Sequence, residues 1–213
     1  HYPLRRQRQM CIRDRLTRWS TGCQLRCAPL PPITKGVISS DGNSRMSITI
    51  RTEQEQDVSS IRHVTQAAFA TAKHASGTEA HIVEALRAAG VLTISLVAEC
   101  NGEVVGHVAA SPVQVSDGAG GWFGFGPVSV LPEYQRQGVG TRLIRSALDA
   151  LRRAGAQGCV LVGDPAYYER FGFNTVPDLT LPDVPPEYFQ ALKFGTRFPV
   201  GSVTFHEAFA AGS

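Results

Sequence analysis

The sequence predicts a mixed α/β fold in a single domain, and three observations carry that prediction. From Met46 onward, segments follow one another in the order strand, two helices, strands, helix, strand, helix and strands. The chain has 213 residues, of which 43% are hydrophobic and 18% are charged, as in ordinary globular proteins. No internal repeat divides residues 46–213, which are long enough for one hydrophobic core.

Residues 1–45 differ from the rest of the chain in charge and in pattern. They hold nine of the 21 Lys and Arg residues but two of the 18 Asp and Glu residues, and they show no sustained period. The run from Arg6 to Arg15 resembles the in-frame translation of a transposase adapter. We therefore expect a disordered or artefactual extension, with Met46 as the natural start. The alternative is a basic arm for nucleic acid or a membrane surface.

Charge and cysteine content narrow the function classes. Residues 46–213 are mildly acidic and hold no apolar run of membrane-spanning length, so we expect neither nucleic acid nor membrane as a partner. Cys100 and Cys159 lie in predicted strands, where a reduced, buried thiol is typical. The chain shows no cluster with zinc-ligand spacing, so we expect no metal. We expect a cytoplasmic protein, either a monomer or a homodimer.

A strand and two helices are predicted first. Residues 47–51 alternate as a strand does, and Asp57 is placed to cap the first helix. A second helix follows Thr78 and stops at Gly90. Apolar residues recur at helical spacing in both segments: Val58, Ile61, Val64, Ala68 and Phe69 in the first, and Ile82, Val83 and Leu86 in the second.

A hairpin is predicted next, because residues 92–100 and 103–115 flank Asn101-Gly102, the strongest short hairpin signal. Residues 122–130 form another strand after a glycine-rich loop. Pro127 lies inside this strand and cannot donate to a ladder, so the strand must bulge or splay near that point.

A long amphipathic helix follows and ends at Gly155. Its apolar face holds Leu143, Ile144, Ala147, Leu148, Leu151 and Ala154, and its polar face holds Arg142, Arg145, Asp149, Arg152 and Arg153. Residues 159–163 then form a strand buried on both faces. Asp164-Pro165 starts a short helix, and residues 171–176 and 202–209 are predicted as final strands.

The loop before the long helix predicts an anion site. A glycine-containing turn that leads into a helix leaves N–H groups free at the positive end of the helix dipole. Gly138 and Gly140 let an anion approach the backbone, and Thr141 adds a hydroxyl. A P-loop requires a lysine after the last glycine, and a dinucleotide fingerprint requires a third glycine where Leu143 stands, so neither fits.

Residues 128–144, VSVLPEYQRQGVGTRLI, resemble the acyl-CoA signature of the GNAT superfamily of N-acetyltransferases. Gln135, Gly138 and Gly140 match its core. A second family element, a tyrosine four residues before a Gly-Phe pair, is matched by Tyr168 before Gly172-Phe173. Residues 161–173 also resemble a bacterial subgroup of acetyltransferases with unsettled substrates.

This resemblance implies a GNAT-like domain over residues 46–213. Its sheet is mixed, mostly antiparallel and splayed between the fourth and fifth strands, with helices on both faces. The pyrophosphate of acetyl-CoA, used as a co-substrate, is then expected on a run of backbone amides, and the pantetheine arm along Val128 and Val130. The amides are those of Arg136, Gln137, Gly138, Val139, Gly140 and Thr141.

The same resemblance implies transfer of an acetyl group to a primary amine of a small molecule or protein by direct attack. Tyr168 would protonate the departing thiolate, with Tyr167 as a minor candidate. The general base is open: His74, Glu79, His81 and Glu84 lie around the first two helices, and His107 reads as a core or lining histidine. The alternatives are another acyl group or a non-catalytic acyl-CoA sensor.

Overall fold

The structure is a computed structural model that describes residues 47–70 and 77–210. The expected extension over residues 1–45, the expected start at Met46 and the candidate base His74 lie outside the described residues. Within the described ranges, no helix is long and apolar enough to cross a membrane.

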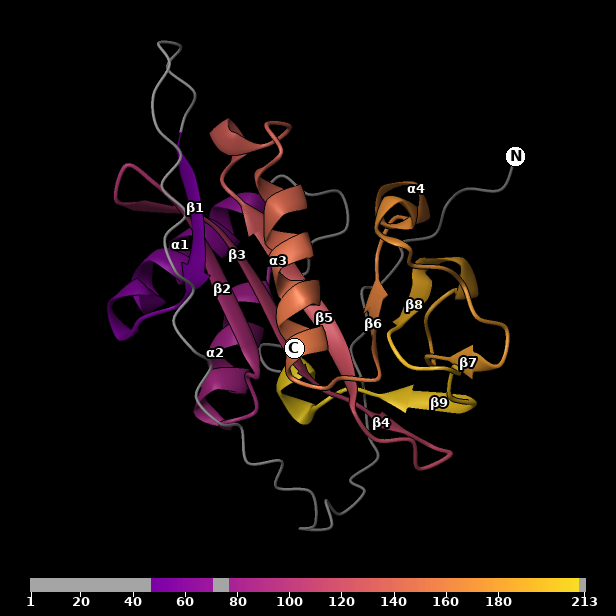
Figure 1. The fold of residues 1–213 in the computed structure, drawn as a ribbon. Helices are drawn as coiled ribbons and strands as arrows, with labels where there is room; N and C mark the ends of the chain where they lie inside the picture. Colours follow the sequence, from indigo (N-terminus) through magenta and orange to yellow (C-terminus); the bar gives the residue numbers. More distant parts are fainter. Residues whose placement is uncertain (1–46, 71–76, 211–213) are drawn as a thin grey trace, which may run out of the picture.

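A six-stranded sheet in the order β1-β2-β3-β5-β6-β8 forms the centre of the molecule (Figure 1). Each neighbouring pair is antiparallel except β5 and β6, which are parallel. The prediction of a mixed, mostly antiparallel sheet is therefore confirmed. Its strands are β1 (Ile48–Thr52), β2 (Ile94–Cys100), β3 (Glu103–Pro112), β5 (Trp122–Val130), β6 (Gly158–Val162) and β8 (Phe189–Lys193).

A smaller three-stranded sheet lies beside the main one, in the order β4-β9-β7 (Figure 1, lower right). Its strands are β4 (Gln114–Val115), β7 (Leu179–Thr180) and β9 (Gly201–Thr204). A separate cluster of buried apolar side chains, which includes Val115, Leu179 and Val203, joins the small sheet to β6 and β8.

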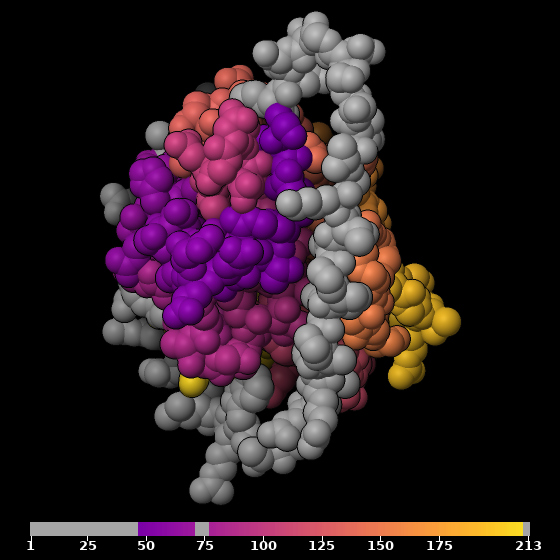
Figure 2. All heavy atoms as spheres, turned by 60° about the vertical axis from the view of Figure 1, so that its left-hand side comes forward, coloured from indigo at the N-terminus to yellow at the C-terminus, as the bar shows by residue number. Residues whose placement is uncertain are grey.

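Helices cover both faces of the main sheet, as predicted. On one face α1 (Val58–Phe69) packs on β5, where the Ser129 hydroxyl donates to Thr65. Beside it lies α2 (Glu79–Ala88), and the two cover the face turned forward in Figure 2. On the other face α3 (Val139–Arg153) packs so closely that a Cβ on Gly106 of β3 would lie 2.9 Å from the Leu143 side chain.

Short helices complete the fold. The helix α4 (Pro165–Tyr168) continues as η3 (Glu169–Phe171) above the end of β6 (Figure 1). As predicted, the Asp164 carboxylate caps α4 by accepting the Ala166 N–H at 3.0 Å. The remaining turns of 3₁₀-helix are η1 (Glu55–Asp57), η2 (Pro132–Tyr134), η4 (Pro186–Tyr188) and η5 (Glu207–Ala210).

Two predictions around the β2–β3–β5 ladder are confirmed. Asn101 and Gly102 join β2 to β3 with φ values of 51° and 87°, the paired positive angles of a type I′ turn. The register of β3 on β5 shifts between Val108 and Ala110, opposite the segment that contains Pro127. The irregularity expected from that proline is therefore present.

Other local predictions are wrong. The Asp57 carboxylate does not cap α1, because it accepts the Gln54 N–H at 2.7 Å and pairs with Arg51. Residues 171–176 form no strand but a single bridge, from Asn174 to Ala191. Of the predicted last strand, residues 202–209, the part up to Thr204 is extended, as the end of β9. A further strand, β8, was not predicted; it has five residues and directly follows a proline-rich turn.

Candidate active site

The loop before α3 leaves a continuous run of main-chain donors without acceptors. We call residues 135–141 the amide loop. Its six consecutive N–H groups from Arg136 to Thr141 donate to no acceptor within the described part of the chain. The helical bonds resume when the Arg142 N–H donates to the Gly138 carbonyl at 3.0 Å. The loop therefore presents donors at the positive end of the α3 dipole.

The conformation of the amide loop explains its glycine. Gly138 is the N-cap of α3 with φ of 84°, in the left-handed region. No atom of the described residues lies within 4 Å of the place where its Cβ would be, so the backbone angle and not crowding requires glycine here. Arg136 also has a positive φ, of 59°, which turns successive amides toward one side.

The glutamine side chains of the loop brace it. Gln135 Nε2 donates to the Val130 carbonyl at 3.0 Å, and Gln137 Nε2 donates to the Glu133 carbonyl at 2.6 Å. Both bonds tie the loop to the chain that leads into it. Gln135 and Gln137 thus hold the backbone amides in place, while the amides themselves stay free to bind a ligand.

Beside the loop, β5 has an open edge. Its pairing with β6 covers three residue pairs, from Trp122 to Gly124, whereas β5 continues to Val130. At the end of β6, the side chain of Val162 is 47% exposed, although the sequence predicted a strand buried on both faces. The predicted splay between the fourth and fifth strands of the sheet is confirmed. We call residues 125–130 the open edge of β5.

The open edge directs backbone groups away from the rest of the sheet. The Leu131 N–H donates to the Val105 carbonyl of β3 at 3.0 Å. Because backbone groups alternate between the two edges of a strand, those of Val130 and Val128 face the opposite edge, toward β6. The Val130 carbonyl accepts the hydrogen bond from Gln135 of the amide loop. The N–H groups of Val128 and Val130 face outward along this edge.

Two adjacent tyrosines of α4 lie at different places, one at the end of β6 and one at the start of α3. Tyr168 packs on the end of β6, where any side chain at Gly163 would overlap its ring, and its ring centroid lies 5.9 Å from that of Phe173. Desolvation raises the pKa of Tyr168 above its ordinary value, which makes its phenol a weaker acid than an exposed tyrosine. Its ring meets that of Tyr167 edge-on at 5.0 Å.

Tyr167 is the residue whose hydroxyl reaches the start of α3. A Cβ on Gly140 would lie 3.1 Å from Tyr167 Oη and 3.7 Å from Val130 Cγ2. Sequence reasoning gave Tyr167 a minor part, because adjacent tyrosines on a short helix offer no signal of which one turns toward α3. The fold brings the Tyr167 hydroxyl, the amide loop and the open edge together.

On the α1–α2 face, four polar side chains form what we call the buried network: Glu53, Arg87, Ser95 and His107. Arg87 holds Glu53 through two bonds of 2.9 and 2.8 Å, and the Ser95 hydroxyl donates to Glu53. Ser95 Oγ lies 2.8 Å from His107 Nε2. Since the Ser95 proton is directed at Glu53, His107 Nε2 carries a hydrogen and His107 Nδ1 is an acceptor.

His107 is fully buried, and its Nδ1 has no partner within the described residues. Desolvation lowers the pKa of His107 to about 4, partly opposed by Glu53, so the ring is neutral at ordinary pH. The expectation of a core or lining histidine is therefore confirmed for its position. In β3 it stands opposite Ser129, the residue between Val128 and Val130.

The other candidate bases are scattered along α2. Glu84 is bound by Arg62 through two bonds of 2.5 and 2.6 Å, which lowers the pKa of the Glu84 carboxyl. His81 is exposed, whereas Glu79 is buried in the first turn of α2. The described residues hold no group of three or more His, Cys, Asp or Glu placed to bind a metal.

Three comparisons bear on this arrangement. Residues 49–176 match the family model of an acetyltransferase (GNAT) domain. YhbS of Escherichia coli, an uncharacterized N-acetyltransferase, is 43% identical over 100 residues, or 46% of this chain and 60% of that relative. The match thus spans less than two thirds of the curated relative.

Two solved structures are similar over nearly their whole length. A GNAT family acetyltransferase from Brucella melitensis, in complex with acetyl-CoA, is 50% identical with a TM-score of 0.69, over 78% of this chain and 99% of that one. The structure of Escherichia coli YhbS in complex with CoA is 32% identical with a TM-score of 0.71, over 82% of this chain and 98% of that one.

Proposed function

The chain belongs to the GNAT acetyltransferase family, and from that premise we propose that it transfers an acetyl group from acetyl-CoA to a primary amine. The catalytic unit comprises residues 46–213. The acceptor is an amine of a small molecule or of a protein, attacked without a covalent enzyme intermediate. The reported complexes of the Brucella and Escherichia relatives with acetyl-CoA and CoA support this choice of donor.

The amide loop binds the diphosphate of the coenzyme. Its six N–H groups and the α3 dipole supply donors and positive potential without a lysine or a metal ion. The surroundings of Gly138 fit this role, since a Cβ there would lie within 4 Å of no atom in the described part of the chain and would stand where the anion approaches. Thr141 adds its hydroxyl at the same helix end.

The open edge of β5 binds the pantetheine arm as an added strand would be bound. The N–H groups of Val128 and Val130 face that edge, and the arm of the coenzyme carries amides that can pair with them. The Val130 N–H, near the thioester carbonyl, stabilises the negative charge that develops on its oxygen during attack.

Tyr168 protonates the sulfur that leaves. As the amine nitrogen forms a bond to the acetyl carbon, the carbon–sulfur bond breaks and the thiolate takes a proton from the Tyr168 hydroxyl. The Tyr168 phenol is protonated at neutral pH, as an ordinary tyrosine is, and so has a proton to give when a thiolate forms beside it. The amine loses its own proton to solvent or to a base on the α1–α2 side.

One observation carries the proposal: the free amides of the loop and the unpaired edge of β5 lie next to each other. Each set of backbone groups lacks hydrogen-bond partners within the described part of the chain. Calorimetry of the full chain with CoA, followed by thiol release from acetyl-CoA over a panel of small amines and peptides, tests it. We expect heat of binding and thiol release with one class of amine. Absence of heat would remove the coenzyme site, and binding without thiol release would favour a sensor.

A further inference from the structure

A basic groove runs along the outer face of α3, between that helix and η3. It is a pocket of about 260 Å³. The residues that line it are Arg145, Leu148, Asp149, Arg152, Arg170 and Phe171. Three arginines and one aspartate therefore line the same groove.

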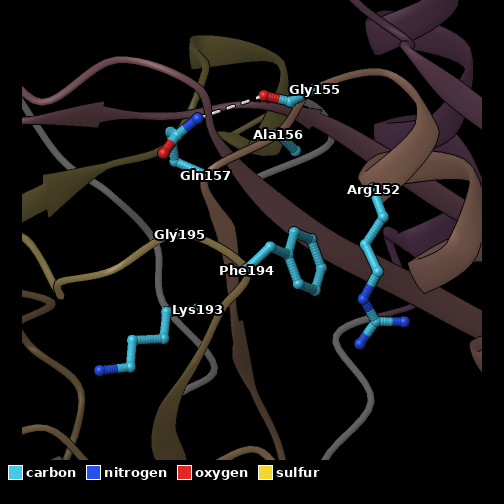
Figure 3. A pocket seen from close by; sticks show the side chains of 7 residues that line it. All are labelled: Arg152, Gly155, Ala156, Gln157, Lys193, Phe194 and Gly195. Carbon is cyan, nitrogen blue, oxygen red and sulfur yellow. Dashed lines mark hydrogen bonds between the residues drawn. The ribbon is translucent and has the colours of Figure 1, made fainter.

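The three arginines differ in their partners. Arg152 donates to Asp149 at 2.9 Å, and its guanidinium lies 4.6 Å from the centre of the Phe194 ring (Figure 3). Arg170 lies 4.7 Å from the centre of the Tyr167 ring. Neither Arg145 nor Arg170 pairs with a carboxylate in the part of the chain described by the structure. These two cations are therefore available to an anion.

Both available cations border the amide loop. Arg145 stands four residues after Thr141 and so lies on the same side of α3, about 7.5 Å along the axis from Gly140. Arg170 is linked to Gly140 through Tyr167, whose ring it covers and whose hydroxyl points at that glycine. Arg152 lies about 18 Å along the axis from Gly140, much farther away.

We propose that Arg145 and Arg170 form a phosphomonoester site that takes the 3′-phosphate of CoA. The inference rests on the proposed function, because the amide loop must hold the diphosphate. In CoA both phosphate groups are attached to one ribose, so the 3′-phosphate lies within several Å of the diphosphate. A dianion at that distance meets Arg145 and Arg170 but not Arg152, and guanidinium groups suit phosphate geometry.

Calorimetry with CoA and with dephospho-CoA tests this site, because the two ligands differ only in the 3′-phosphate. The full chain should bind CoA at least about 10-fold more tightly than dephospho-CoA. Arg145→Gln and Arg170→Gln should each weaken CoA binding about 10-fold and leave dephospho-CoA binding unchanged. Unchanged binding of dephospho-CoA also shows that each variant is folded.

Arg152→Gln is the matched control, since it removes a cation from the same groove and should not change the ratio of the two affinities. Equal binding of both ligands by the unmodified chain would overturn the 3′-phosphate site and leave the proposed function standing. If Arg152→Gln weakened CoA binding as much as Arg145→Gln does, the 3′-phosphate would be held by the overall positive charge of the groove and not by a specific site, which would overturn the inference. If neither ligand binds, the proposed function fails and takes this inference with it.

Discussion

The amide loop and the buried network differ in whether their polar groups have hydrogen-bond partners within the described part of the protein. The loop holds six donors that have no acceptor among residues 47–70 and 77–210, whereas the network joins Glu53, Arg87, Ser95 and His107 to one another. Exposed donors are solvated by water when no ligand is bound, so leaving them unpaired costs little. Buried groups have no such alternative, and an unpaired one costs about 1–3 kcal/mol. Within the network, His107 Nδ1 is such an atom among the described residues, while the other groups are paired.

This difference separates the binding function from the stability of the fold. The backbone N–H groups proposed to bind the coenzyme lie at the start of α3 and along the open edge of β5. The paired groups of the network join the residue after β1 to α2, β2 and β3. Substitutions in the loop should therefore alter CoA binding without unfolding the chain. Substitutions in the network should lower the stability of the fold and leave CoA binding by the folded chain unchanged.

The largest expected effect follows from placing a negative charge in the amide loop. Gly138→Asp sets a carboxylate before the free amides, where it repels the diphosphate and takes their hydrogen bonds. We expect CoA affinity to fall at least about 1,000-fold, or about 4 kcal/mol. Calorimetry with CoA measures the loss.

Gly118→Asp is the matched control for backbone strain. Gly118 has φ of 83°, against 84° for Gly138, and its Cβ would likewise meet nothing within 4 Å. The two variants should therefore lose similar thermal stability while only Gly138→Asp loses CoA binding. Equal CoA binding by both variants would contradict the role of the amide loop.

Local signals predicted the loop better than the network. Asn101-Gly102, Gly138 and Asp164-Pro165 each encode a turn through neighbouring residues, and the structure has each where the sequence puts it. The network joins residues 53, 87, 95 and 107, which are far apart in the sequence, so no local spacing predicts that their side chains make contact. Asp57 misled for the same reason, since Arg51 and the Gln54 N–H occupy its carboxylate.

The C-terminal elements were also hard to predict, because pairing rather than pattern decides them. β8 is extended because it lies against β6 along five residue pairs, and its own sequence follows a proline-rich turn that suggests a loop. Residues 171–176 alternate well but find a partner only at Asn174. The orientation of Tyr167 likewise depends on how α4 packs against α3.

A smaller effect is expected from the tyrosines, and it tests whether chemistry belongs to the exposed edge. Tyr168→Phe removes the proposed proton donor but keeps the ring that packs on Gly163. We expect kcat to fall about 100-fold, or about 2.7 kcal/mol, with CoA affinity nearly unchanged. Steady-state kinetics with an accepted amine and calorimetry with CoA separate the two quantities.

Tyr167→Phe is the adjacent control and should leave kcat within about threefold of the unmodified chain. A reversed outcome, with the large loss in Tyr167→Phe, would assign the proton to the hydroxyl beside Gly140. That result would move the chemistry from the end of β6 to the start of α3, while the rest of the coenzyme site would stay as proposed.

The smallest expected effect concerns acid stability, and it tests the buried network. The pKa of His107 is about 4 in the folded chain because the ring is desolvated, against an ordinary 6.5. On acidification the unfolded chain therefore takes up this proton first, so the stability present above pH 6.5 is lost as the pH falls toward 4. Between pH 6.5 and 4.5 the free energy of unfolding should fall by about 2 kcal/mol through His107 alone.

His107→Gln should remove that part of the pH dependence, since glutamine keeps a donor for Ser95 Oγ but binds no proton. The charged groups that face His107 are Glu53 and Arg87, and although desolvation opposes the shift, hydrogen bonds from Arg87 and Ser95 lower the pKa of Glu53. His63→Gln, on the exposed side of α1, is the control and should keep the slope. Urea unfolding at several pH values measures both, and an unchanged slope in His107→Gln would mean that the buried imidazole does not couple folding to pH.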